Sequence, residues 1–228
     1  MVECVQTFGR KIFMDNKEKA LKAVELLENE YPEAICSLEY TEPLQLLIAT
    51  RLAAQCTDKR VNMVTPALFE RYKDVQDFAN ADADEIGKYI YSCGFYKTKS
   101  KDIVEMCKMI ISDFNGTVPD NVDDLIKLQG VGRKTANLIV GDIYKKPAVV
   151  VDTHCIRITN RLGLHNSKNP EKIETILRKL LPPDKSNDFC HRLVLHGRAV
   201  CDSRKPKCEK CCMKHICTYF ENSQLSVE

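Results

Sequence analysis

The stretch Leu128-Gln129-Gly130-Val131-Gly132-Arg133-Lys134-Thr135-Ala136-Asn137 decides the fold, because it places two glycines between two short segments that both read as helices. Gly130 and Gly132 permit a positive φ and a close backbone approach, and Val131 between them can turn its side chain inward. The turn would then present its amide groups and the start of the next helix outward, where a nucleic-acid phosphate is a natural ligand. An ordinary helical hairpin with a glycine turn would also explain the two glycines.

The rest of the chain is helical in pattern as well. Asp15 and Glu18 have the spacing of a capping box, apolar residues follow at helical intervals, and Pro32 closes that segment. The only β-like stretch, Val149-Val150-Val151, is too short and isolated to build a sheet, so the sequence predicts an all-α protein. Further helices are expected at residues 43–54, 58–72 (broken near Pro66), from Asp82 toward Gly94, up to Gly116, and at 122–128, 133–144, 153–162, 170–181 and 186–200.

Composition sets broad limits on the function. The 228 residues allow one large domain or two small ones, and no apolar run approaches the length of a membrane span. Residues 1–6 lack the basic and apolar regions of a secretory signal, so we expect a cytoplasmic protein without a membrane partner, associated with the nucleoid in a bacterium. The net charge of +2 does not by itself indicate a nucleic-acid partner.

The twelve cysteines divide into two groups. Seven are scattered singly and read as small hydrophobic residues in a reducing compartment, and the other five crowd between positions 201 and 217. The spacing Cys201-x6-Cys208-x2-Cys211-x5-Cys217 supplies four thiolates, which suit either a [4Fe–4S] cluster or a tetrahedral zinc ion. Spacing alone does not decide between an iron–sulfur cluster and zinc. Because Cys212 is adjacent to Cys211, either of these two cysteines could be the third ligand. Six Lys and Arg residues between positions 196 and 219 could contact phosphates or could simply be solvated.

The segment 128–137, followed by Val151-Asp152-Thr153-His154, closely resembles the helix-hairpin-helix and downstream aspartate of endonuclease III-like DNA glycosylases. The resemblance covers roughly Lys17 to Phe220. One departure is Gln129, where the family usually has proline, and we expect this residue to loosen the turn slightly.

The resemblance implies two helical domains that flank a DNA-binding cleft. Residues 36–146 would form a six-helix barrel containing the helix-hairpin-helix at about 122–141. Residues 1–35 together with 147–228 would form a discontinuous domain that carries the iron–sulfur cluster loop at 201–217.

Lys134 and Asp152 are the catalytic residues that the resemblance implies. Displacing a base from the sugar carbon C1′ needs a nucleophile and a nearby negative charge, because C1′ develops cationic character. Lys134 lies in the first turn of a predicted helix, where the helix dipole and the neighbouring Arg133 favour the neutral, nucleophilic amine. Asp152 follows an apolar run and could stabilise the cation or relay protons. Taken singly, Lys134 reads as a solvated surface residue and Asp152 as a helix N-cap.

The lysine also indicates the branch of the superfamily. Relatives that excise adenine without nicking commonly have serine at the position of Lys134, and thymine-mismatch relatives commonly have tyrosine. The segment 191–198 likewise resembles the endonuclease III branch, which implies a bifunctional glycosylase/AP lyase for oxidised pyrimidines in base excision repair. Two alternatives remain at this point: a monofunctional glycosylase for mismatched or alkylated bases, and a non-catalytic hairpin DNA-binding protein with a structural metal.

The resemblance also implies a cofactor and a partner. The cysteine spacing matches the family's cluster loop and implies a [4Fe–4S] cluster on Cys201, Cys208, Cys211 and Cys217. The expected partner of a monomeric enzyme is double-stranded DNA with damaged bases or abasic sites. Gln55 falls where the family inserts an amide into the space of the flipped base, and Phe95 is either an apolar wedge or ordinary core. The remaining DNA contacts are expected at Gly130, Val131, Gly132, Arg133, Arg204 and Lys205.

Overall fold

The computed structural model describes residues 14–225, and residues 1–13 and 226–228 lie outside it. The prediction for residues 1–6 and the first part of the predicted 1–35 segment therefore lie outside the described residues. Within 14–225 the chain forms twelve α-helices and no β-strand, which confirms the predicted all-α fold. None of the helices in this range is both long and apolar enough to cross a membrane.

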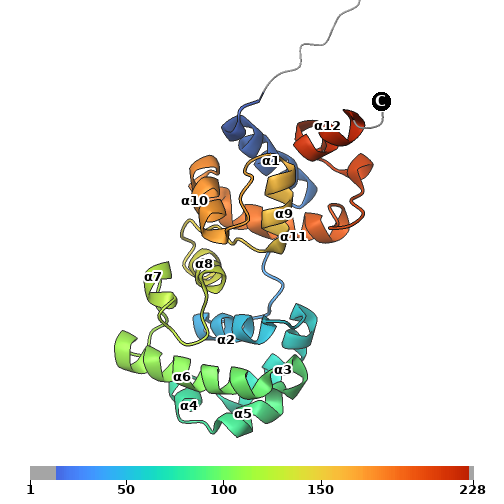
Figure 1. The fold of residues 1–228 in the computed structure, drawn as a ribbon. Helices are drawn as coiled ribbons and strands as arrows, with labels where there is room; N and C mark the ends of the chain where they lie inside the picture. Colours follow the sequence, from blue (N-terminus) through green and yellow to red (C-terminus); the bar gives the residue numbers. More distant parts are fainter. Residues whose placement is uncertain (1–13, 226–228) are drawn as a thin grey trace, which may run out of the picture.

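Figure 1 shows the helices gathered into two lobes. We call the part built from α2 to α8 the first lobe, and the part built from α1 and α9 to α12 the second lobe. The first-lobe helices are α2 (Pro43–Ala53), α3 (Asp58–Arg71), α4 (Val75–Ala79), α5 (Ala83–Ile90), α6 (Tyr96–Phe114), α7 (Val122–Leu125) and α8 (Arg133–Asp142), with a short 3-10 helix η1 (Tyr91–Cys93).

The second lobe brings the first helix of the chain against the last third of the sequence. In Figure 1, α1 lies beside the helices that follow α8, and its residues contact both α10 and α11. The helices of this lobe are α1 (Asn16–Glu30), α9 (Thr153–Arg161), α10 (Pro170–Leu180), α11 (Ser186–Ala199) and α12 (Thr218–Leu225), with 3-10 helices η2 (Pro183–Lys185), η3 (Cys208–Lys210) and η4 (Lys214–Ile216).

Each lobe has its own hydrophobic core. The core of the first lobe includes residues from Leu38 to Ala148, and that of the second combines the buried face of α1 with residues from Val149 to Met213. The chain thus passes from one core to the other between Ala148 and Val149. The predicted β-like stretch is an extended, buried segment without strand pairing. Because it anchors the start of α9 in the second core, Asp152 belongs to the second lobe, whereas Lys134 on α8 belongs to the first.

The helix ends largely follow the predicted signals. The capping box of α1 is confirmed: the Glu18 amide donates to Asp15 Oδ1 at 2.8 Å, and the Asp15 amide donates to Glu18 Oε2 at 3.0 Å. The break predicted near Pro66 is wrong, because α3 continues through it. Proline has no amide hydrogen, so the carbonyl four residues earlier in the helix has no hydrogen-bond donor there. Pro66 is on the exposed face, where water can reach the backbone, and the packing of the buried face stabilises the helix. Two helices were not predicted: α4, which has five residues, and α12, which has eight.

Candidate active site

The hairpin between α7 and α8 turns on Gly130. This residue has a φ of +75°, and a Cβ there would lie 2.7 Å from the Nε of Arg51, so both conformation and space require glycine. Val131 is buried, as predicted. Gly132 differs from the prediction, because it is the N-cap of α8 with a φ of −95° and open space around its Cα. The start of α8 is therefore accessible from outside.

Gln129 replaces the family's proline with a hydrogen-bonding side chain. Its Nε2 donates to Asp102 Oδ1 at 2.9 Å, and the other oxygen of Asp102 accepts from Arg51 Nε at 2.9 Å. The prediction that Gln129 loosens the turn did not take into account this hydrogen bond, which ties the turn to α6. Because Asp102 lies on α6 and Arg51 on α2, the side chains of three first-lobe segments meet at the base of the hairpin.

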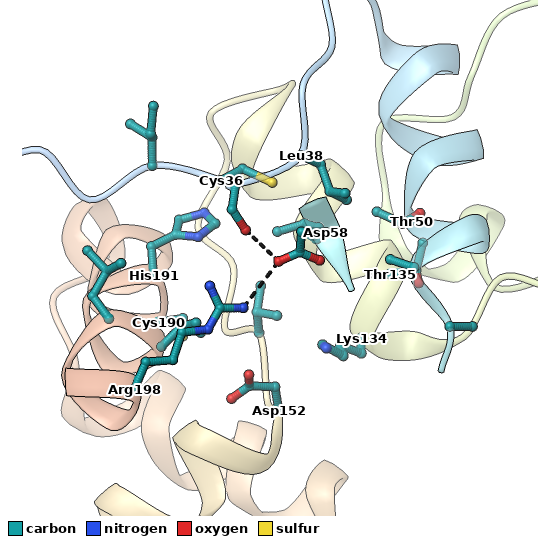
Figure 2. A pocket seen from close by; sticks show the side chains of 18 residues that line it. Cys36, Leu38, Thr50, Asp58, Lys134, Thr135, Asp152, Cys190, His191 and Arg198 are labelled. Carbon is teal, nitrogen blue, oxygen red and sulfur yellow. Dashed lines mark hydrogen bonds and ion pairs between the residues drawn. The ribbon is translucent and has the colours of Figure 1, made fainter. Parts of the chain in front are cut away.

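Lys134 and Asp152 lie across from each other at the boundary of the two lobes. Both line a cavity of about 320 Å³ between the lobes, and Figure 2 shows both side chains directed into this space. Lys134 is exposed in the first turn of α8, at the open end of the helix. Across residues 14–225, no side chain forms a hydrogen bond or ion pair with the Lys134 amine. An amine free of intramolecular partners is available to a ligand in the cavity.

Asp152 is the N-cap of α9, so its ordinary structural role is present as well. Its Oδ1 accepts from the Cys155 amide at 2.7 Å, which leaves the other carboxylate oxygen for a ligand. Burial lowers the pKa of the nearby His154. The carboxylate of Asp152 opposes this shift, and the guanidinium groups of Arg157 and Arg198 reinforce it.

The cavity also contains Asp58, to which the sequence analysis assigned no role, and Arg198, which it counted only among the basic residues that could contact phosphates. Asp58, in the first turn of α3, accepts from Ser37 Oγ at 2.6 Å and from Arg198 Nη2 at 3.2 Å (Figure 2). Arg198 lies in the last turn of α11, so this ion pair joins the two lobes at the wall of the cavity. Arg198 falls inside the segment 191–198, which carries the family resemblance, and Asp58 lies three residues after Gln55. The two residues are 140 positions apart, and no pattern in one sequence predicts that they form an ion pair.

Gln55 and Phe95 occupy two exposed turns of the first lobe. Gln55 has a φ of +56° in the turn after α2, and Phe95 has a φ of +49° just before α6. Left-handed backbone is costly for such residues and often marks a functional position. Phe95 is 66% exposed, so of the two readings open in the sequence, ordinary core is wrong for this residue. The structure does not test the DNA contact predicted for either side chain.

The predicted basic contacts differ in their surroundings. Arg133 does not project freely beside Lys134, because its guanidinium binds Glu174 of the second lobe with N–O distances of 2.7 and 3.1 Å. Arg204 and Lys205 are exposed, and their backbone amides donate to Asp202 Oδ1 at 2.8 and 2.9 Å. This turn fixes the backbone of the loop while its basic side chains remain accessible.

Four of the five cysteines between positions 201 and 217 line one small cavity in the second lobe. Its walls include apolar side chains such as Val200, Pro206 and Phe220. Cys212 is not among the lining residues, although it had left the third ligand position open in the sequence. Arg161 Nη1 lies 3.2 Å from the sulfur of Cys201. The four thiols that line the cavity are those of Cys201, Cys208, Cys211 and Cys217.

Burial disfavours the thiolate form of three of these four thiols. It raises the pKa of Cys211 to about 12 and also raises the pKa of Cys208 and Cys217. Thiolates in this cavity therefore need a compensating positive charge, which a bound metal cluster would supply. In the part of the chain that the structure describes, no three His, Cys, Asp or Glu side chains lie close enough together to hold a single metal ion. Four thiols around one cavity would instead suit a thiolate-bound group that is larger than a single ion.

The fold and this site together define a helix-hairpin-helix DNA-repair protein: a lysine at the start of the second hairpin helix faces an aspartate on the other lobe. Comparison with known proteins agrees with this class. The family described as "HhH-GPD superfamily base excision DNA repair protein" matches residues 48–183. Endonuclease III of Synechocystis sp. is 46% identical over 88% of this chain and 92% of its own length. Endonuclease III of Bacillus subtilis is 40% identical over 82% and 86%, respectively.

Solved structures show the same likeness. A trapped endonuclease III–DNA covalent intermediate has a TM-score of 0.86 and 36% identity, and the match covers 92% of this chain and all of that one. A thermostable thymine-DNA glycosylase has a TM-score of 0.82 and 26% identity, with 90% and 97% covered. The chain therefore belongs to the endonuclease III family of the HhH-GPD superfamily, bifunctional DNA glycosylase/AP lyase enzymes of base excision repair.

Proposed function

We propose that this enzyme removes oxidised pyrimidines from duplex DNA, with Lys134 as the nucleophile and Asp152 as its carboxylate partner. One observation carries the proposal: the two side chains come from different lobes and line the same cavity of about 320 Å³. A cavity of this volume falls within the usual range of small-molecule sites, and a base must leave the duplex to enter it. The choice of oxidised pyrimidines over other bases rests on the lysine and on the family branch.

The reaction follows from the chemistry of the two groups. The lone pair of the Lys134 amine attacks C1′, while the bond from C1′ to the base breaks and the base leaves with its electron pair and gains a proton. Asp152 stabilises the positive charge on the sugar and accepts a proton from the attacking nitrogen. The sugar ring then opens to a Schiff base. Loss of a proton from C2′ expels the 3′ phosphate with its bonding pair, and water hydrolyses the imine to release the lysine.

Duplex DNA with damaged bases or abasic sites would bind across the face that carries the hairpin. The exposed start of α8 at Gly132 would hold a phosphate, as helix N-termini commonly do. The exposed Gln55 and Phe95 would enter the duplex and hold the place of the flipped base. Arg204 and Lys205 would contact the phosphate backbone from the second lobe. Solved endonuclease III structures, including a non-covalent complex, contain DNA, which supports this partner.

A [4Fe–4S] cluster is the group that we propose for the late cysteines. Cys201, Cys208, Cys211 and Cys217 would hold it, since these four thiols share one cavity and thiolate is the usual ligand of such clusters. When bound, the cluster would cross-link the loop from 201 to 217 and supply structural rigidity. No step of the base-excision chemistry above needs it, and its role here is to fix the basic loop beside the DNA.

The proposal is tested with duplexes that carry thymine glycol, uracil, or adenine opposite oxidised guanine. We expect base release and strand cleavage with thymine glycol, and a covalent complex when borohydride reduces the Schiff base. Lys134→Gln should abolish trapping, and Asp152→Asn should slow base release while it keeps the N-cap. Covalent trapping that persists in Lys134→Gln would refute the lysine assignment. Base release from the wild type without any nicking would instead indicate a monofunctional glycosylase.

A further inference from the structure

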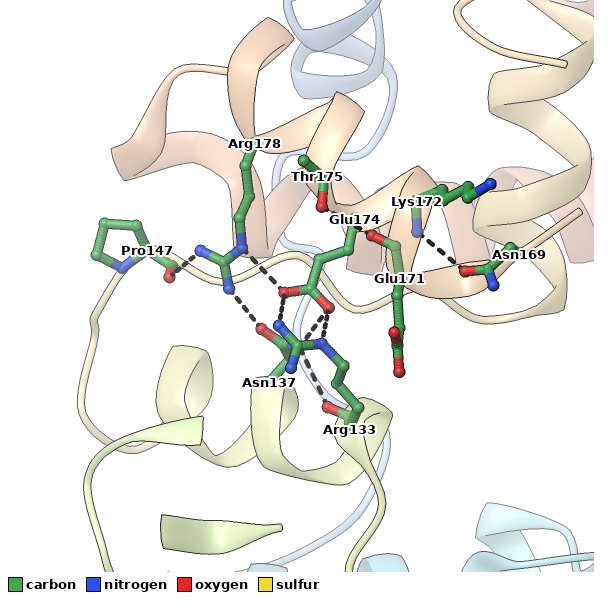
Figure 3. Close-up of polar contacts among 9 residues, drawn as sticks. All are labelled: Arg133, Asn137, Pro147, Asn169, Glu171, Lys172, Glu174, Thr175 and Arg178. Carbon is green, nitrogen blue, oxygen red and sulfur yellow. Dashed lines mark hydrogen bonds and ion pairs between the residues drawn. The ribbon is translucent and has the colours of Figure 1, made fainter. Parts of the chain in front are cut away.

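A buried carboxylate joins the two lobes immediately beside the proposed nucleophile. Glu174 of α10 is only 3% exposed and accepts from the Arg133 guanidinium, from the Arg178 Nε at 3.0 Å and from the Asn137 Nδ2 at 3.2 Å (Figure 3). Buried carboxylates are expensive unless they are paired and fully hydrogen-bonded, and this one has both guanidinium and amide donors. The arrangement is therefore a defined structural feature rather than a surface ion pair.

The contacts of Glu174 bracket Lys134 on α8. Arg133 directly precedes the lysine in the chain, and Asn137 follows it by nearly one helical turn. The Asn137 amide donates both to Glu174 and to the carbonyl of Arg133 at 3.1 Å, so the carboxylate binds the helix on both sides of Lys134. Lys134 enters the cavity from between these two contacts.

Arg178 extends the same contacts to the connection between the lobes. Its Nη2 donates to Asn137 Oδ1 at 2.8 Å, and its Nη1 donates to the Pro147 carbonyl at 3.2 Å. Pro147 lies just before the point where the chain passes from the first core to the second. Figure 3 shows Arg178 reaching from α10 to both partners. The helix that carries Lys134 and the segment that leads to Asp152 are thus both bound to α10.

We propose that Glu174 is a positioning residue for the base-excision step, and that it acts through Arg133 and Asn137 to hold Lys134 in register with Asp152. This inference rests on the proposed function of Lys134 and Asp152. The two catalytic groups belong to different lobes, so their separation depends on contacts between lobes. Displacements near 1 Å in a catalytic site can cost up to ~100-fold in rate, so a loosened contact at this place has a large expected effect.

Three variants separate positioning from general destabilisation. Glu174→Gln removes the charge but keeps the shape, and Arg133→Lys keeps the charge but loses the two-pronged contact with the carboxylate. The Arg133 and Arg178 side chains are 43% and 37% exposed, so water can solvate them when the carboxylate is lost and both variants should fold. The matched control is Glu25→Gln, which breaks an exposed ion pair with Lys22 within α1 of the second lobe.

Two reactions are measured for each variant under single-turnover conditions. Base release from thymine glycol needs Lys134 and Asp152 together. Borohydride trapping on a preformed abasic site needs only the amine and the sugar aldehyde. We expect base release to fall at least about tenfold in Glu174→Gln and in Arg133→Lys, and trapping on the abasic site to change less than about threefold. The affinity for the duplex, its salt dependence and the Tm are recorded in parallel, and Glu25→Gln should match the wild type in every measurement.

The outcomes test the positioning role of Glu174 separately from the proposed function of the enzyme. Parallel losses of base release and trapping, or unchanged base release in both variants, would overturn the positioning role of Glu174. A weaker affinity with a reduced salt dependence in Arg133→Lys, at an unchanged rate of base release, would also overturn it, because Arg133 would then act on the DNA phosphates. Failure of the proposed function shows in the wild type itself, which would release no base or form no trapped complex.

Discussion

Lys99 offers the sharpest test of how the two exposed turns of the first lobe are held. Its side chain is 1% exposed, and its ammonium donates to the Leu52 carbonyl at 2.8 Å and to the Cys93 carbonyl at 2.9 Å. The first carbonyl lies three residues before Gln55, and the second lies two residues before Phe95. One buried lysine therefore fixes the backbone beneath both side chains that we propose to enter the duplex. The informative substitution is Lys99→Met, which keeps the length and the apolar packing but removes the donor.

The expected cost follows from the two hydrogen bonds. Bonds to a charged donor contribute about 1.5–3 kcal/mol each, and their loss leaves two buried carbonyls without a partner. Burial also lowers the pKa of Lys99, which shows that desolvation of the ammonium offsets part of this gain. We therefore expect Lys99→Met to lower the free energy of unfolding by about 2–4 kcal/mol. For a chain of this size the corresponding fall in Tm is roughly 5–15 °C.

Thermal melts followed by circular dichroism measure this effect, with Lys101→Met as the control. Lys101 lies on the same helix but is exposed, so its substitution should change the free energy of unfolding by less than about 0.5 kcal/mol. The affinity of Lys99→Met for a duplex with an abasic site should fall as well, because both turns lose their common anchor. A Lys99→Met protein that melts with the wild type, or a Lys101→Met protein that melts equally early, would refute the reasoning.

Three further predictions concern other parts of the molecule. Burial raises the pKa of Asp142, but hydrogen bonds from α11 outweigh it and leave that pKa lowered, so the wild type should melt above Asp142→Asn at neutral pH. That advantage is present above the ordinary aspartate pKa and should vanish in melts as the pH falls below about 4. Cys211→Ser should lose iron and sulfide in elemental analysis, whereas Cys212→Ser should retain both; the reverse result would place Cys212 in the ligand set. Phe95→Ala should keep its Tm but lose roughly tenfold in affinity for lesion duplexes in titrations, and equal affinity would remove its wedge role.

The sequence alone predicted those features whose causes are local. Gly130 and the capping box at Asp15 are encoded within a few residues, because a left-handed turn needs glycine and a helix start needs a side-chain acceptor. The break expected at Pro66 failed for the opposite reason. The helix rule for proline is local, but burial of the far face of α3 against the first core outweighs it.

Contacts between the lobes could not be predicted. Glu174 reads as one more charge on an amphipathic helix, and its partner Arg133 lies 41 positions away. A single sequence contains no trace of such a pair. Lys99 did leave a signal, because it stands four residues before Ile103 on the apolar stripe of its helix. A lysine in phase with a buried face needs acceptors inside the protein, and the structure supplies two backbone carbonyls.

The second lobe closes around a helix from the opposite end of the chain, and this has a consequence for synthesis. During translation α1 leaves the ribosome on the order of ten seconds before α9, α10 and α11, at usual elongation rates. In that interval the first lobe has all its own residues and can fold, whereas the apolar face of α1, formed by Ala20, Ala23, Val24 and Leu27, has no partner. During synthesis the first lobe can therefore be complete while the apolar face of α1 is still unprotected, and we expect α1 to be the segment that a chaperone would bind.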